Sequence, residues 1–92
     1  PEFAGINREK SGKIGVKWKR NKNAEGYQIQ YAAKKDFSDA RTISVSGGKT
    51  VKKTLPKLKK NKTYYIRIRS YVLSPGEFYS PWSKKKSVKT AR

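Results

Sequence analysis

The chain has 92 residues, which gives room for one small domain, and it contains no Cys and no His. These absences exclude disulfides, thiolate nucleophiles, zinc held by Cys, and imidazole acid–base catalysis. The 24 Lys and Arg outnumber the 6 Asp and Glu, giving a formal net charge of +18. Because the few carboxylates are scattered, we expect no paired-carboxylate site, no enzyme activity, no metal and no cofactor.

Hydrophobic residues make up only 34% of the chain, a content that favours disorder in such a charged sequence. Aromatic residues reach 12% and lie inside short alternating segments, so we expect a folded core beneath a lysine-rich surface. No apolar run reaches the ~18–20 residues of a membrane span, and we expect no membrane insertion. The chain begins at Pro1 and contains no Met. We therefore expect a piece of a longer protein, with residues 1–6 as a cloning remnant or linker and residues 7–92 as the domain.

Two strands with clear alternation are predicted at residues 14–18 and 27–31, joined by a polar connector over residues 21–26. Each strand carries three large apolar side chains at alternate positions: Ile14, Val16 and Trp18, then Tyr27, Ile29 and Tyr31. A period of two places these side chains on one face of each strand. Both strands are therefore predicted to be half-buried.

Two short strands are predicted in the middle of the chain. Residues 42–46 alternate apolar and hydroxyl side chains before a turn at Gly47 and Gly48. Residues 51–55 continue the alternation until Pro56, where the strand must end because proline cannot donate to a central ladder.

The longest predicted strand covers residues 64–72, and a loop at residues 74–77 separates it from a last segment over residues 78–90. The inward side chains of all these strands are predicted to form the core: Ile14, Val16, Trp18, Tyr27, Ile29, Tyr31, Leu55, Leu58, Tyr64, Ile66 and Ile68. Short strands with regular turn clusters and no helical pattern predict an all-β sandwich or small barrel.

These landmarks follow the order seen in fibronectin type III domains, and the resemblance covers about residues 7–90. Residues 14–18 resemble that family's strand B with its core tryptophan, and residues 26–31 resemble its strand C. Leu58 precedes Tyr64 by the spacing of the family's tyrosine corner, in which the phenol hydroxyl bonds back to the backbone.

Residues 64–69 resemble strand F of the family, and residues 83–90 resemble strand G. The lysine-rich loops and the segment over residues 79–83 are similar to type III repeats of bacterial secreted and cell-surface proteins. The resemblance implies a seven-stranded, antiparallel, immunoglobulin-like β-sandwich with strands A, B and E facing C, C′, F and G.

Three features depart from the family pattern. Only Phe3, Ile6 and a charged stretch precede Gly12, so we expect strand A to be short or frayed. Lys86 occupies a position that is usually apolar, so its stem must lie along the surface or the strand must bulge. No Arg-Gly-Asp tripeptide lies in the loop over residues 73–77, so the integrin-binding feature of the family has no counterpart here.

The basic surface is the first candidate binding site, because a large positive potential attracts polyanions. The candidate lysines are those of one loop and of the approach to the last strand: Lys57, Lys59, Lys60, Lys62, Lys84 and Lys85. Lysine greatly outnumbers arginine, so we expect such contacts to be non-specific. The alternative is that the lysines only solvate the domain and guard its sheet edges.

The outer face of the C–F–G sheet is the second candidate, as a surface for a protein partner: Gln28, Gln30, Tyr65, Arg67, Arg69 and Tyr71. The same side chains can instead stack on one another, with Trp82 over Arg67 or Arg69. Such a stack would be similar to the tryptophan–serine motif of cytokine-receptor domains. Counting back from an inward Val88 points Trp82 inward unless Pro81 marks a bulge, and both orientations stay open at this point.

The resemblance implies a non-catalytic extracellular spacer or adhesion module of a larger bacterial cell-surface or secreted protein. Its expected partners are the neighbouring domains of the parent chain, and the charge favours a monomer. One alternative is a module that binds teichoic acid, nucleic acid or a sulfated glycan through its lysines. Another is an accessory domain of a carbohydrate-active enzyme.

Overall fold

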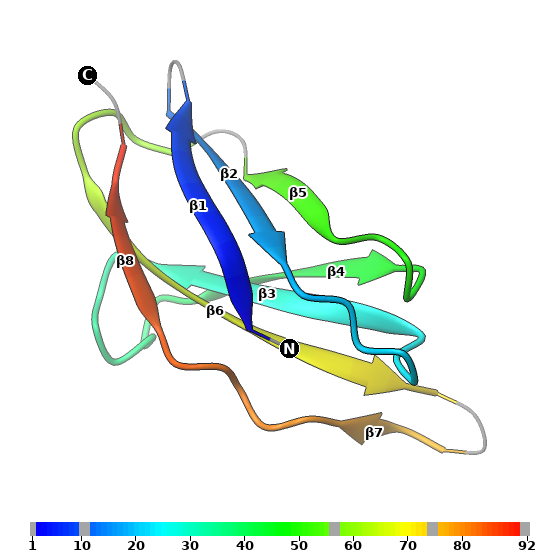
Figure 1. The fold of residues 1–92 in the computed structure, drawn as a ribbon. Helices are drawn as coiled ribbons and strands as arrows, with labels where there is room; N and C mark the ends of the chain where they lie inside the picture. The colour runs from blue at the N-terminus through cyan, green and yellow to red at the C-terminus, as the bar shows by residue number, and fades with distance from the viewer. Residues whose placement is uncertain (1, 10–11, 56–57, 74–75, 91–92) are drawn as a thin grey trace.

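Eight β-strands form two antiparallel sheets in the computed structural model, which describes residues 2–9, 12–55, 58–73 and 76–90 (Figure 1). In chain order the strands are β1 (Phe3–Glu9), β2 (Lys13–Trp18), β3 (Gly26–Ala32), β4 (Arg41–Ser46), β5 (Lys52–Leu55), β6 (Thr63–Val72), β7 (Phe78–Tyr79) and β8 (Lys86–Lys89).

The smaller sheet has the strand order β1-β2-β5, and the larger sheet has the order β4-β3-β6, with both β7 and β8 paired to the far edge of β6. The two sheets face each other across the core (Figure 1). This arrangement confirms the predicted antiparallel β-sandwich with sheets A-B-E and C-C′-F-G. The described residues contain eight strands rather than seven because the last strand is divided into β7 and β8.

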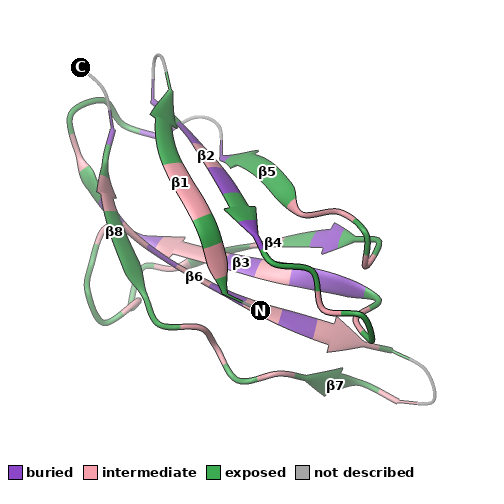
Figure 2. Ribbon diagram, in the orientation of Figure 1, coloured by how far each residue is buried: buried purple, intermediate pink, exposed green. Residues whose placement is uncertain are grey.

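The core lies between the inward faces of β2, β3 and β6, where buried and partly buried residues alternate (Figure 2). Ten of the eleven predicted core residues are buried, while Tyr31 is only half-buried against the core. Ala32 and Val45 are buried as well and were not predicted. Fully burying a large apolar side chain contributes roughly 1.5–3 kcal/mol, so this alternation supplies most of the folding drive.

Two buried tyrosines tie loops to the core through their hydroxyls. The Lys59 N–H donates to the Tyr64 hydroxyl at 2.9 Å, which confirms the predicted tyrosine corner. The hydroxyl of Tyr27 donates to the Gly48 carbonyl at 2.9 Å and accepts the Asn21 N–H at 3.0 Å. Each buried phenol is therefore hydrogen-bonded, as burial of a polar group requires.

Strand A is neither short nor frayed, contrary to the prediction. β1 runs from Phe3 to Glu9 and pairs with the full length of β2, so that Ile6 faces Val16 and packs against the core. Residues 3–6, which were predicted as part of a remnant or linker, form the first half of this paired strand. The backbone of β2 supplies the pairing that the charged sequence of β1 did not reveal.

Three sequence predictions fall outside the described residues. They are the end of the fourth predicted strand at Pro56, the candidate Lys57, and the start of a loop at residues 74–75.

Candidate functional site

The outer face of the larger sheet holds two matched pairs of polar side chains. β3 and β6 pair in a register that places Gln28 opposite Arg69 and Gln30 opposite Arg67. Each arginine donates its Nε–H to the Oε1 of the opposite glutamine at 2.8 Å. Four of the six residues predicted for this face are therefore held by direct hydrogen bonds.

Aromatic rings cover both guanidinium groups. The Arg67 guanidinium carbon lies 4.1 Å from the ring centroid of Phe37 and 4.7 Å from that of Trp82. The Arg69 guanidinium carbon lies 4.3 Å from Trp82 and 4.1 Å from Tyr79. The five side chains thus form an alternating stack, here called the arginine–aromatic ladder. Each exposed cation–π contact is worth about 0.5–1 kcal/mol.

The two remaining predicted residues lie beside the arginine–aromatic ladder. The Tyr71 ring lies 6.3 Å from the Tyr79 ring, with an angle of 51° between their planes. The Lys85 Nζ lies 6.0 Å from the ring centroid of Tyr65. The structure therefore brings all six predicted residues to one face, where the two arginines stack with Phe37, Trp82 and Tyr79.

Two serine hydroxyls attach the segment between β7 and β8 to β6. The Ser80 N–H donates to the Ser70 carbonyl, and the Ser70 N–H donates to the Ser80 Oγ, both at 2.9 Å. The Ser83 N–H donates to the Ile68 carbonyl at 2.8 Å, and the Ile68 N–H donates to the Ser83 Oγ at 3.0 Å. Pro81 and Trp82 thus lie opposite the single residue Arg69, which is the two-against-one count of a β-bulge.

Two one-residue shifts of register, one on each side of Trp82, decide where this side chain points. Val88 pairs with Tyr64 and packs against the core, and unbroken alternation from Val88 would have turned Trp82 inward. Counting back from Val88, the register shifts by one residue between Lys86, which pairs with Ile66, and Ser83, which is bonded to Ile68. This shift reverses the side-chain parity, so Trp82 lies over the arginines, and the bulge at Pro81 reverses it again toward β7. Lys86 is exposed.

Phe37 was not predicted as part of this face. Its loop is held by two carboxylates: Asp39 accepts the N–H groups of residues 33–34 at 3.2 Å, and Asp36 accepts the Ser38 N–H at 2.9 Å. Phe37 itself adopts a φ of 59°, which turns its ring back toward Arg67. The signal that sequence reasoning passed over was a single aromatic residue in an otherwise polar loop. Tyr79 was likewise missed as a member of the stack.

We expect acid to release the Phe37 loop. The Ser38 N–H holds the pKa of Asp36 below the usual aspartate value of about 3.9, because it binds the ionised carboxylate. Because the pKa of Asp36 is lower in the folded chain than in the unfolded chain, its ionised carboxylate stabilises the fold fully at pH values above the unfolded-state pKa. This stabilisation is lost as the pH falls through the folded-state pKa. Proton NMR titration should show the Phe37 ring signals shifting with the Asp36 midpoint.

The control for this titration is Asp36→Asn, which keeps an acceptor for the Ser38 N–H but has no proton to gain. It should abolish the part of the Phe37 shift that follows the Asp36 midpoint, while Asp39 still holds the N–H groups of residues 33–34. Phe37 signals that stay constant down to pH ~2 in the unaltered chain would contradict the prediction.

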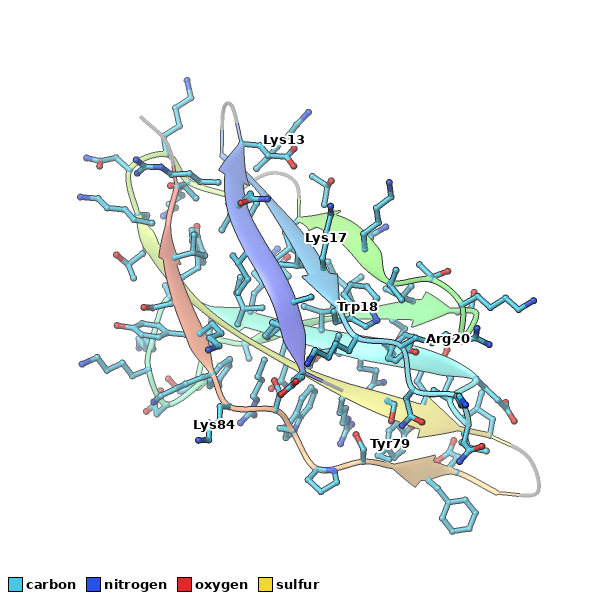
Figure 3. The ribbon with its side chains drawn as sticks, viewed as in Figure 1. Lys13, Lys17, Trp18, Arg20, Tyr79 and Lys84 are labelled. Carbon is cyan, nitrogen blue, oxygen red and sulfur yellow. The ribbon has the colours of Figure 1, made fainter. Side chains whose placement is uncertain are left out.

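The candidate lysines lie in two separate places. Lys59 and Lys60 are exposed in the loop between β5 and β6, which lies near the C-terminal end of β8 (Figure 1). Lys84 and Lys85 directly precede the N-terminal end of β8 (Figure 3). Lys62 is half-buried near the first group, where its N–H donates to the Thr90 Oγ1 at 2.9 Å. The described candidates therefore do not form one cluster.

Few of the basic side chains are neutralised. Within the described ranges one ion pair forms, between Lys19 Nζ and Glu2 Oε1 at 2.6 Å. Its hydrogen bond lowers the pKa of Glu2 and raises that of Lys19. Lys13 and Lys17 point away from the sandwich, while Trp18 points into it (Figure 3). The surface potential is therefore dominated by unpaired lysines.

The described part of the chain contains no group of three or more His, Cys, Asp or Glu side chains placed to hold a metal ion. Nor do the described residues include a helix long and apolar enough to cross a membrane.

The two facing antiparallel sheets and the tyrosine corner define an immunoglobulin-like sandwich. Within that class the chain has the fibronectin type III fold, as predicted. It matches the chicken CNTN1 FN1-FN3 domains with a TM-score of 0.80 and 27% identity, covering 100% of this chain and 31% of that structure. The fn3 domain of human contactin 1 matches with a TM-score of 0.74 and 24% identity, covering 96% of this chain and 73% of that one.

A third match is the fn3 domain of the human collagen alpha-1(XX) chain, with a TM-score of 0.77, 21% identity, and coverage of 97% of this chain and 80% of that one. No protein-family model matches the sequence, and no curated protein sequence matches it either. At these identities the second and third structures support the fold alone.

Proposed function

We propose that the chain is a non-catalytic module of a larger extracellular protein, in which it joins or spaces neighbouring domains. The observation that carries this proposal is the fibronectin type III fold over the whole chain. The chain spans only 31% of the CNTN1 FN1-FN3 structure, as one module of a multidomain protein does.

The course of the first and last strands supports the spacer role. β1 and β8 lie side by side and run in the same direction, so the chain enters at one end of this pair and leaves at the other (Figure 1). The molecule is elongated, with extents of 44 × 25 × 19 Å. A module with this path can be linked head to tail into a rod.

Polyanion binding is a second candidate function, supported by the net charge of +18 and by the scarcity of ion pairs in the described residues. Lysine-rich surfaces bind phosphate and sulfate polymers through counterion release, and this affinity falls steeply with salt. An origin in a bacterial surface protein and a role beside a carbohydrate-active enzyme stay predictions from the sequence.

A salt-dependent titration separates the two candidates. The purified domain is titrated with wall teichoic acid, heparin and duplex DNA, and with a neutral glycan as control. A spacer should release all three polyanions together by about 0.15–0.2 M salt, because the contacts are only electrostatic. Exchanging Lys59 and Lys60 for glutamine should weaken binding as much as exchanging Lys84 and Lys85, since each change removes the same charge.

Retention of one polymer at ~0.5 M salt, after the others have dissociated, would contradict the spacer function and favour specific recognition. Unequal effects of the two double substitutions would then locate the recognition site.

A further inference from the structure

β4 is an edge strand whose outer side has no partner strand among the described residues. The Gly47 N–H donates to the Glu25 carbonyl at 2.9 Å, in register with the pairing of β3 and β4. Because facing residues of an antiparallel ladder alternate between bonded and non-bonded pairs, the N–H and C=O groups of Thr42, Ser44 and Ser46 point outward. The outer side of β4 thus presents a row of backbone donors and acceptors.

The composition of β4 sets it apart from the edges formed by β5 and β8. Proteins commonly guard an exposed edge strand with lysine or proline. β5 carries Lys52 and Lys53, and β8 carries Lys86 and Lys89. Residues 42–46 contain no charge and no proline, although 33% of the chain is charged. Only Arg41 stands at the start of β4, so this edge lacks the lysines that β5 and β8 carry.

The side chains of β4 are already held in place. The Gln30 amide donates to the Thr42 hydroxyl at 3.3 Å, and the Gln28 amide donates to the Ser44 hydroxyl at 3.5 Å. These glutamines also accept from the arginines of the arginine–aromatic ladder. The edge is therefore the border of an ordered sheet, and little conformational entropy would be lost there on binding.

A groove of about 390 Å³ opens beside the first half of β4. Its apolar lining includes partly buried or buried side chains from four segments: Tyr31, Ile43, Leu58 and Tyr64. Lys59, Lys62 and Arg41 stand around it, together with the carboxylate of Asp39, which already accepts two backbone N–H groups. The groove can receive an apolar side chain, and its charged rim favours an acidic neighbour.

We propose that the outer edge of β4 binds an extended acidic segment of a partner protein, which adds to the larger sheet as an antiparallel or parallel strand. Main-chain hydrogen bonds to Thr42, Ser44 and Ser46 would supply the affinity, and alternate apolar side chains would enter the groove. A second copy of this chain is a poor occupant, because a net charge of +18 on each molecule opposes their approach. An acidic partner strand is attracted by that same charge.

The test uses the whole chain and three blocked peptides at ~0.15 M salt. The first is EVEIEVE, the second is the rearranged EEEEVIV with the same charge, and the third is EVEIEVE with its backbone N-methylated at alternate residues. The readout is amide hydrogen exchange by NMR. We expect EVEIEVE to slow the exchange of Thr42, Ser44 and Ser46 about tenfold, and the other two peptides to leave it unchanged.

Ser44→Pro removes an outward N–H without breaking a backbone hydrogen bond to β3, so it should weaken the binding of EVEIEVE at least about tenfold. The matched control is Ser87→Pro in β8, because the Thr90 N–H bond to the Lys62 carbonyl places the Ser87 N–H on the side away from β6. This variant should bind as the unaltered chain does.

Equal protection by the rearranged or the methylated peptide would overturn the proposal, even if the proline variant failed to fold. Protection that appears without peptide and rises with protein concentration would also overturn it, because the occupant would then be a second copy. Because the spacer function makes no statement about β4, failure here leaves that proposal untouched.

Discussion

Replacing Trp18 by alanine is expected to lower the free energy of unfolding by about 3–5 kcal/mol. Trp18 is 2% exposed, and its ring packs against that of Tyr27 at 5.3 Å between centroids with an angle of 60°. The substitution removes the largest buried side chain between the sheets and leaves a cavity that the surrounding strands cannot fill. Since the total free energy of unfolding of a domain of this size is roughly 5–15 kcal/mol, the variant should lose a large part of its stability.

The chain offers a matched control in its second tryptophan. Trp82 lies on the outer face between Arg67 and Arg69, so Trp82→Ala should cost only about 1–2 kcal/mol, the sum of two cation–π contacts. Urea unfolding followed by far-UV circular dichroism measures both values. Equal losses for the two variants would contradict the assignment of one tryptophan to the core and the other to the surface.

The indole of Trp18 also carries an unsatisfied group. Its Nε1–H is buried and has no hydrogen-bond partner among the described residues. An unpaired buried donor costs about 1–3 kcal/mol, so Trp18→Phe should lose far less stability than Trp18→Ala. This side chain contributes through its area and shape and not through its polar atom.

The alternation of the sequence was enough to predict the central strands. In β2 and β6 nearly every inward residue is large and apolar and nearly every outward residue is polar, and a shift by one residue would bury the whole polar set. The tyrosine corner was also predictable, because the spacing of Leu58 and Tyr64 implies a definite hydrogen bond. These features are local in the sequence and agree with one another.

The other features of the fold and of the outer face depended on tertiary contacts that no local sequence pattern reveals. β1 forms because β2 offers backbone partners, although the last three residues of β1 are polar or charged. The orientation of Trp82 depends on the hydroxyls of Ser80 and Ser83, which take up N–H groups of β6 and so permit an inserted residue. Tyr31 is less buried than its alternation predicted, because it borders the open groove beside β4.

The second large effect is expected at Gly12, where alanine should cost about 3 kcal/mol. Gly12 has a φ of +73°, a conformation that costs an L-residue about 1–2 kcal/mol. A Cβ at this position would also collide with the carbonyl oxygen of Leu58. Neither group can move freely, because the Leu58 N–H donates to the Gly12 carbonyl at 2.9 Å.

Gly47→Ala is the control that separates conformational strain from collision. Gly47 has a φ of +97°, but the nearest atom to an added Cβ is the Thr50 Oγ1 at 3.3 Å. It should therefore cost about 1–2 kcal/mol, mainly from backbone conformation, because the Thr50 side chain can move aside. Urea unfolding gives both values, and equal losses would mean that the contact with Leu58 is of no consequence.

Gly12→Ala is also expected to affect the loop over residues 58–62. Leu58 directly precedes Lys59, whose N–H donates to the Tyr64 hydroxyl. A displacement of Leu58 would therefore strain this hydrogen bond. The exchange of the Lys59 amide should therefore accelerate in Gly12→Ala and stay unchanged in Gly47→Ala. An unchanged Lys59 amide in a destabilised Gly12→Ala would show that the tyrosine corner holds this loop independently of the β1–β2 turn.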